Sequence, residues 1–296
     1  MIASDRQMIL GLRLGGLGEG ADLAEQAGLD FVLFGDPTGE LDGVVGADAL
    51  SVAAFLMTTT RKIGLVAGVR DDWAPFNVAR ALASFDLLSG GRCGWVALRA
   101  SGDDDPARSE EHLDVVLQLF DSWEDGALVF DKASAVFADR TKVHRIRHAG
   151  AYYTVDGPLN APRSPQGRPV LFQPIASASD AADVVLTGLD DLGPASRASV
   201  PTAKLLAEAA IDLGADSGAR CAALADRLVD AFAKGECDGF VLAPANPETD
   251  IPLLADQLVR QLQRGGLATA GPGVGDFRAR LGLARPANRF AGLIGP

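Results

Sequence analysis

The sequence predicts an α/β protein whose strands form a parallel sheet, and two observations carry this prediction. Strand-like and helix-like segments alternate at short intervals over the first hundred residues, which is the order expected of parallel strands joined by helices. Residues 31–34 form a continuous apolar run, as expected of a parallel strand that is covered on both faces. With 296 residues, of which 48% are hydrophobic, the chain fits one large α/β barrel domain or two smaller domains.

Residues 73–99 show one complete repeat of this pattern. Pro75 suits the first position of a helix, where the N–H that proline lacks would have no partner within the helix. Gly90 and Gly91 end that helix, because glycine readily adopts the left-handed conformation found at helix ends. A buried strand is then expected at 92–98.

The other elements of the first half follow from the same signals. Expected strands lie at 8–14, 31–34 and 62–69, with expected helices at 23–27 and 47–58. A charged loop is expected at 103–109. The next helix carries its apolar residues at helical spacing on one face, namely Leu113, Val116, Leu117 and Phe120.

The second half first interrupts this alternation and then resumes it. Residues 126–165 are rich in turn formers, and 143–155 is expected to form an antiparallel hairpin beside the sheet. The remaining expected elements are strands at 169–174, 182–186 and 240–243, a helix at 222–233, and a helix that begins near Asp250. Residues 204–213 fit a helix or a further strand. The helix between Leu186 and Lys204 is expected to be missing or shortened.

The composition excludes several classes of function. The formal charge of −12 argues against a nucleic-acid partner, because the phosphates would be repelled. A cytoplasmic protein without a membrane partner is expected, because no apolar run approaches bilayer length and the N-terminus lacks the apolar core of a signal peptide. Three scattered cysteines give no disulfide framework, and the three histidines lack metal-ligand spacing, so no metal site is expected.

A glycine-rich turn after the first expected strand suggests a different function. Gly16, Gly18 and Ala21 fit the pattern G-x-G-x-x-G/A, and Asp36 lies about where dinucleotide-binding proteins carry a ribose-binding carboxylate. An ordinary turn at the end of a strand explains the same glycines. An NAD(P)-binding oxidoreductase that uses the turn from Gly16 to Ala21 is therefore one alternative.

Residue identities in three ordered blocks point to a family. The first block comprises residues 77–80, 84–92 and 94–95, the second spans 147–173, and the third comprises 238–240, 262–266 and 281–283. Together they resemble the bacterial luciferase-like flavin-dependent monooxygenases, in the branch that oxidises nitrilotriacetate, EDTA and dibenzothiophene sulfone. The blocks cover most of the chain, which resembles a shortened and divergent member of that branch.

The resemblance implies one (β/α)8 TIM barrel domain over residues 1–296, with the hairpin insertion at about 126–165. In such barrels the active site lies at the C-terminal ends of the strands, so the flavin is expected across these ends. The implied cofactor is reduced FMN, which a separate reductase supplies, and the substrate is a small organic molecule. No residue stands out as catalytic. The cofactor-binding positions that the resemblance implies are Asp36, Gly68, Val96, Gln173 and Ser177.

The chain departs from the family at several of these positions. Gly68 stands where relatives usually carry a flavin-contacting threonine, and Val96 stands where they usually carry asparagine. The phosphate-binding turn of the family has a changed sequence from Gln173 to Ser177. Because each lost donor leaves a flavin atom unpaired, we expect weak FMN binding and no flavin retained through purification. A non-catalytic barrel that acts as a flavin binder or partner subunit is therefore the main alternative to a monooxygenase.

The resemblance also implies a homodimer that forms through helices of the first half of the chain. Ala53, Ala79 and Ala83 are expected to let two helices approach closely across that interface. An open, doubly wound sheet would contradict the barrel and favour the nicotinamide alternative.

Overall fold

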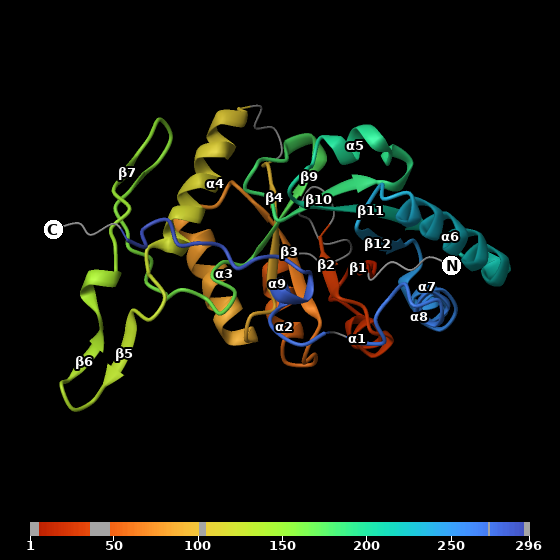
Figure 1. Cartoon of the computed structure of the whole chain (residues 1–296), viewed down its shortest axis with the longest axis horizontal. Helices are drawn as coiled ribbons and strands as arrows, with labels where there is room; N and C mark the ends of the chain where they lie inside the picture. Colours follow the sequence, from red (N-terminus) through yellow and green to blue (C-terminus); the bar gives the residue numbers. More distant parts are fainter. Residues whose placement is uncertain (1–5, 36–47, 101–104, 272, 293–296) are drawn as a thin grey trace.

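The structure, a computed structural model, describes residues 6–35, 48–100, 105–271 and 273–292. Eight parallel strands close into a barrel in the order β1-β12-β11-β10-β9-β4-β3-β2, with helices around it (Figure 1). The closed barrel confirms the (β/α)8 fold. The strands of the barrel are β1 (Ile9–Leu14), β2 (Phe31–Phe34), β3 (Gly64–Arg70), β4 (Cys93–Leu98), β9 (Val170–Pro174), β10 (Val184–Gly188), β11 (Lys204–Ile211) and β12 (Gly239–Pro244).

The helices alternate with these strands at nearly the predicted places. In the described ranges they are α1 (Ala21–Ala27), α2 (Ala49–Leu56), α3 (Pro75–Ser89), α4 (Pro106–Asp121), α5 (Pro194–Ala198), α6 (Ser217–Ala233), α7 (Pro247–Leu253), α8 (Arg260–Arg264) and α9 (Phe277–Arg280). A π-helical segment, Leu254–Val259, joins α7 to α8 without a break.

Local sequence explains where the helices begin and end. α1 and α3 end at Gly28 and Gly90, which both adopt the left-handed conformation, as predicted. The prediction of a loop at 103–109 is wrong from Pro106 onward, where α4 begins. Asp105 is the N-cap of α4, and its carboxylate accepts a hydrogen bond from a backbone N–H in the first turn of the helix at 3.0 Å.

The last long helix also begins earlier than predicted. α7 starts at Pro247, so Asp250 lies within the helix and is not its N-cap. Its buried carboxylate accepts a hydrogen bond from the N–H of Asn246 at 3.1 Å, and it therefore still stabilises the start of the helix from inside.

Two connections in the second half of the barrel are short. β9 leads to β10 through a 3₁₀ turn at Ile175–Ser177, and β10 leads to β11 through the five-residue helix α5. The shortened helix expected between Leu186 and Lys204 is confirmed. The segment at 204–213 is a strand, because Lys204–Ile211 pairs with β10 on one side and β12 on the other.

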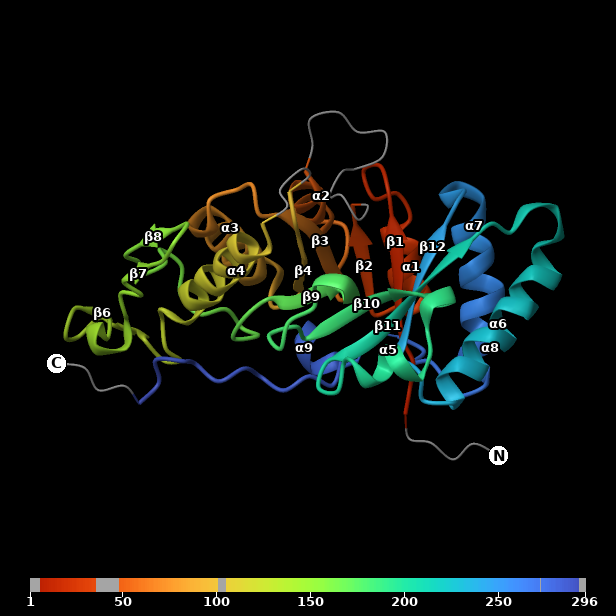
Figure 2. The ribbon, with the colours of Figure 1, turned by 90° about the horizontal axis from the view of Figure 1, so that it is seen from above.

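Residues 126–165 leave the barrel as two hairpins, which lie beyond α4 on the left of Figures 1 and 2. β5 (Leu128–Asp131) pairs with β6 (Val136–Ala138), and β7 (His148–Ala149) pairs with β8 (Thr154–Val155). The hairpin predicted at 143–155 corresponds to the second pair and is confirmed. The first pair was not predicted.

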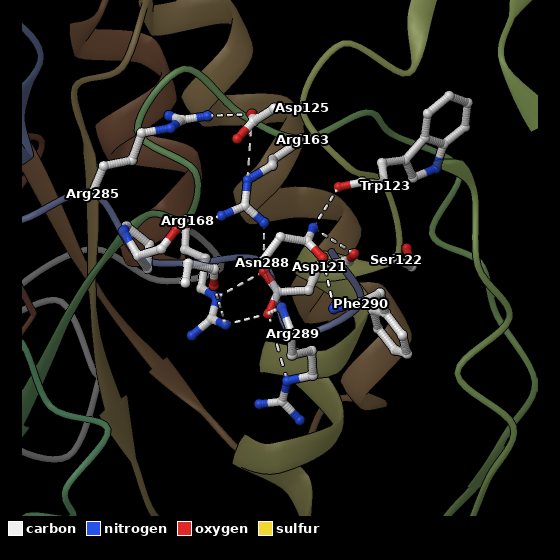
Figure 3. A network of polar contacts seen from close by, with 12 residues as sticks. Asp121, Ser122, Trp123, Asp125, Arg163, Arg168, Arg285, Asn288, Arg289 and Phe290 are labelled. Carbon is white, nitrogen blue, oxygen red and sulfur yellow. Dashed lines mark hydrogen bonds and ion pairs between the residues drawn. The ribbon is translucent and has the colours of Figure 1, made fainter. Parts of the chain in front are cut away.

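A buried carboxylate anchors the base of these hairpins to the C-terminal segment (Figure 3). Asp121, at the end of α4, accepts hydrogen bonds from Arg163 Nη1 at 2.6 Å and Arg168 Nε at 3.0 Å. The side-chain amide of Asn288 donates to the carbonyl oxygens of Asp121 and Trp123 at 2.8 and 2.9 Å. Segments far apart in the sequence are thereby held at one point.

Aromatic side chains fill the interior of the barrel. The ring of Phe31 lies 5.3 Å from that of Phe172 and 5.9 Å from that of Phe277, between ring centroids. Phe277 comes from α9, which closes the N-terminal end of the barrel. A Cβ atom at Gly64 or Gly94 would lie 2.5 or 3.0 Å from the Phe277 ring, so these two glycines make room for it.

The three alanines expected at a dimer interface are buried within the chain. Ala53 and Ala79 have no exposed surface, Ala83 is 2% exposed, and all three belong to the core between the barrel and its helices. The prediction that they contact a second helix across an interface is wrong, because their faces pack inward against the protein's own core.

Candidate functional site

Two of the predicted cofactor positions lie together inside the barrel. Gly68 on β3 is the register partner of Val96 on β4, and Val96 pairs in turn with Phe172 on β9. Val96 is 5% exposed and packs in the apolar cluster of the barrel interior. These two positions therefore offer a ligand an apolar surface without a side-chain hydrogen-bonding group.

Gln173 and Ser177 lie on the other face of the barrel wall. Side chains alternate along a strand, and because Phe172 packs inside the barrel, Gln173 faces outward. It lines an external pocket of about 240 Å³ together with Ser177 and Trp95. Asp36 falls outside the described residues. The structure thus joins Gly68 with Val96 and Gln173 with Ser177, but it separates the two pairs.

The amide of Gln173 is used by its own turn. Oε1 accepts hydrogen bonds from the N–H and the hydroxyl of Ser179 at 3.0 and 2.8 Å, and Nε2 donates to the carbonyl of Ser177 at 3.3 Å. The hydroxyl of Ser177 donates to the carbonyl of Pro174 at 3.5 Å. These bonds close the short link between β9 and β10.

The polar groups deeper in the external pocket are also committed to protein contacts. The carboxylate of Asp71 accepts hydrogen bonds from the N–H of Ala100 at 2.8 Å and from the hydroxyl of Ser109. Burial lowers the pKa of His112, and its Nε2 lies 2.9 Å from the carbonyl of Trp73. The lowered pKa favours the neutral imidazole, and its proton lies on Nε2, because a carbonyl oxygen only accepts.

A charged pair that the sequence analysis missed lies at the mouth of the barrel. Arg13, near the end of β1, and Glu208, on β11, form a two-pronged ion pair past the intervening strand β12, with Arg13 Nε 2.8 Å from Glu208 Oε1. Arg13 also donates to the carbonyl of Gly35. Charged residues within otherwise apolar strands were the available signal, since buried charges persist only where they are paired.

The glycine turn after β1 is explained by packing. Gly18 and Gly20 have φ angles of 80° and 94°, which favour glycine. A Cβ at Gly18 would lie 2.4 Å from Leu56 Cδ1, and one at Gly20 would lie 2.8 Å from Ile251 Cδ1. The dinucleotide interpretation is wrong, because it needs an open, doubly wound sheet and this sheet is a closed barrel.

Two further findings concern the whole of the described chain. Within its described ranges, no group of three or more His, Cys, Asp or Glu side chains is placed to hold a metal ion. Of the helices in those same ranges, none combines the length and apolar character that a membrane span requires.

Comparison with known proteins identifies the family. Residues 4–210, more than half of the chain, match the family described as luciferase-like monooxygenase. The chain belongs to the luciferase-like monooxygenase family. Its membership supports a reduced-flavin monooxygenase activity in general, and relatives named for dibenzothiophene sulfone and nitrilotriacetate confirm the predicted branch.

One luciferase-like relative matches over nearly its whole length. It is a subunit of the pristinamycin IIA synthase of Streptomyces pristinaespiralis, 35% identical over 285 residues, which cover 94% of this chain and 92% of that protein. A second subunit of the same synthase is 32% identical over 103 residues, 30% of this chain and 20% of that protein.

Other luciferase-like proteins match in part or in fold. The dibenzothiophene-sulfone monooxygenase of Rhodococcus erythropolis is 39% identical over 147 residues, so the match spans 44% of this chain and 32% of that relative. The structure of the EDTA monooxygenase of Chelativorans sp. BNC1 covers 95% of this chain and 99% of its own, with a TM-score of 0.75 and 22% identity. This likeness confirms the barrel fold.

At the predicted cofactor positions that the structure describes, the residues of this luciferase-like chain do not fit FMN. The barrel interior presents Gly68 and Val96, which give the polar edge of a flavin no side-chain partner. The pocket at Gln173 has about 240 Å³, below the roughly 300–1,000 Å³ typical of small-molecule sites. Its lining includes one guanidinium, that of Arg99, against the two carboxylates of Asp71 and Glu110, so it offers no net positive charge to hold a phosphate.

Proposed function

We propose that this chain is one subunit of a two-subunit monooxygenase, which oxidises a small organic substrate with reduced FMN supplied by a separate reductase. The observation that carries the proposal is the nearly full-length likeness to a protein named as a synthase subunit. The second subunit named for that synthase is also similar to this chain, over 103 residues, which supports an assembly of two related chains.

The geometry of the cofactor positions supports the role of a subunit over that of an independent enzyme. In a two-subunit enzyme, a companion luciferase-like chain supplies the hydrogen-bonding groups for the flavin that Gly68 and Val96 lack. The barrel described here then contributes binding surface and stability to the assembly. This arrangement unites the two hypotheses from the sequence, a flavin-dependent monooxygenase and a partner subunit.

The test uses the chain alone, a companion luciferase-like chain from the same organism that resembles the second synthase subunit, and the two chains expressed together. Each preparation is titrated with FMN, and binding is followed by the quenching of flavin fluorescence. We expect the two chains to elute as one complex that quenches FMN at micromolar concentration, whereas this chain alone does not.

Two outcomes would contradict the proposal. One is that the chain alone purifies yellow with bound FMN, which would make it an independent flavoprotein. The other is that light scattering finds no complex between the two chains at any concentration tested. The homodimer expected from the family stays a prediction that the same measurement checks, and Phe55 on α2 and Leu88 on α3, which are 62% and 73% exposed, are available for either kind of dimer.

A further inference from the structure

A cleft with a volume of about 890 Å³ opens at the C-terminal ends of β1 and β12. Its sides are the turn from β1 to α1 and the turn from β12 to α7, which are neighbours in Figure 2. Substrates bind at this face of (β/α)8 barrels. The volume also lies within the roughly 300–1,000 Å³ of typical small-molecule sites.

The walls of the cleft are mostly apolar. On the side of β12 and α7 they consist of small or apolar residues, namely Ala243, Pro244, Ala245, Pro247, Ile251 and Pro252. On the opposite side they consist of Leu14, Leu23 and the backbone of Gly15, Gly16 and Gly20. Two exposed carboxylates, Glu19 and Glu248, disfavour an anionic ligand, and the polar residues Asn246 and Thr249 also line the cleft.

Arg13 supplies the charged hydrogen-bond donor in the lining of this cleft. Glu208 neutralises its charge and holds the planar guanidinium through two bonds, and the carbonyl of Gly35 takes a third N–H. A guanidinium has five N–H groups. Among the contacts of the described residues, two of these groups are therefore left for a ligand that enters the cleft.

We propose that this cleft binds an uncharged organic molecule with a carbonyl oxygen, and that this oxygen accepts a hydrogen bond from Arg13. The apolar walls take up the carbon skeleton, and Glu208 is the positioning residue that orients the guanidinium. The inference rests on the proposed function in one respect, because it names the substrate class that this barrel would bring to the two-subunit enzyme.

The experiment measures the binding of two uncharged fluorescent probes to the isolated chain. Nile red carries a carbonyl oxygen, and N-phenyl-1-naphthylamine carries none. Ala245→Trp fills the cleft from an exposed position, and Ala223→Trp places the same side chain on the exposed face of α6 as a control. The double variant Arg13→Met/Glu208→Gln removes the donor without leaving a buried charge unpaired.

We expect Ala245→Trp to weaken the binding of both probes at least tenfold (about 1.4 kcal/mol) and Ala223→Trp to leave it unchanged. The double variant should weaken the binding of Nile red by roughly tenfold, since a hydrogen bond to a charged group is lost, and leave N-phenyl-1-naphthylamine unaffected. Equal binding of Nile red by wild type and Ala245→Trp would show that the probe does not bind in this cleft, and would overturn the proposal. Equal weakening of both probes in the double variant would overturn the role of Arg13.

These measurements need neither the companion chain nor flavin. If the probes fail to bind while the two chains form an FMN-binding complex, the ligand cleft is wrong and the proposed function stands. If the probes bind as expected and no complex forms, the proposed function is wrong and the cleft stands.

Discussion

Buried carboxylates in this barrel differ in how well the surrounding side chains compensate their charge. Asp121 is fully buried, and arginine side chains and the N–H of Arg289 surround it. Among the described residues, the carboxylate of Asp30, just before β2, accepts one hydrogen bond, from the N–H of Leu10 at 2.8 Å. Burial outweighs this bond and the charge of Arg280, and it raises the pKa of Asp30 to about 6.

The raised pKa of Asp30 makes the stability of the protein depend on pH. A carboxyl group whose folded pKa lies above its unfolded value stabilises the fold fully below the unfolded value of about 3.9, and this contribution is lost as the pH rises through about 6. Between pH 4 and pH 7.5 we expect the wild type to lose roughly 2–3 kcal/mol relative to Asp30→Asn. Chemical denaturation across this range measures the difference, and Asp226→Asn, at an exposed site on α6, is the control. Parallel pH profiles of the free energy of unfolding for wild type and Asp30→Asn would refute the raised pKa of Asp30.

The site was only partly predictable from single residues, and the reason lies in strand geometry. The sequence places Gly68 and Val96 at the ends of strands, and the structure brings them together. The sequence does not reveal that Gln173 faces outward, because a strand buried on both faces shows no polar alternation. Arg13 and Glu208 were missed because they are 195 positions apart, and only the order β1-β12-β11 makes them neighbours.

At the scale of elements, the four-residue helix α9 makes more contacts with the barrel than its length suggests. Phe277 has no exposed surface and contacts the rings of Phe31 and Phe172. The next residue, Arg278, donates to both carboxylate oxygens of Asp183 at 2.5 and 2.7 Å, and its N–H donates to Gln166 at 2.8 Å. α9 therefore joins the barrel interior to the strand ends around it.

Truncation of the buried ring tests this role of α9. We expect Phe277→Ala to lower the free energy of unfolding by about 3–5 kcal/mol, because it leaves a cavity in a closely packed interior. Phe130→Ala is the matched control, since the Phe130 ring is 63% exposed on the β5–β6 hairpin. Urea denaturation compares the two variants. A similar loss in both would mean that α9 does not support the barrel.

The elements that the sequence predicted best are those whose local signals agree with the fold. α3 has proline at its start and glycine at its end, and its bounds were predicted correctly. The segment 204–211 was ambiguous because its alanine and leucine residues suit a helix, and it becomes β11 only through its two neighbouring strands. The β5–β6 hairpin was missed because its strands are short and largely exposed, so they lack a buried face.

At the scale of the whole molecule, the C-terminal segment ties the hairpins to the barrel. Replacement of Asn288 by Ala removes the donors to the carbonyl oxygens of Asp121 and Trp123, which destabilises the base of the hairpins by about 1–3 kcal/mol. We expect faster amide hydrogen exchange at Glu124 and His144 and unchanged exchange in the barrel strands. Asn160→Ala, at an exposed position, is the control. Unchanged exchange at both amides would contradict the role of Asn288 in holding the hairpins to the barrel.

The place of α9 near the end of the chain also has a consequence during synthesis. Phe31 leaves the ribosome early, but Phe277, which packs against it, comes after the last barrel strand. At roughly 5–20 residues per second, the interval between the two is on the order of tens of seconds. Throughout that time the aromatic interior lacks the Phe277 ring and stays partly exposed. Exposed apolar surface of this kind favours the binding of chaperones to the nascent chain. A product that terminates before residue 277 keeps the same surface open and is a target for proteases.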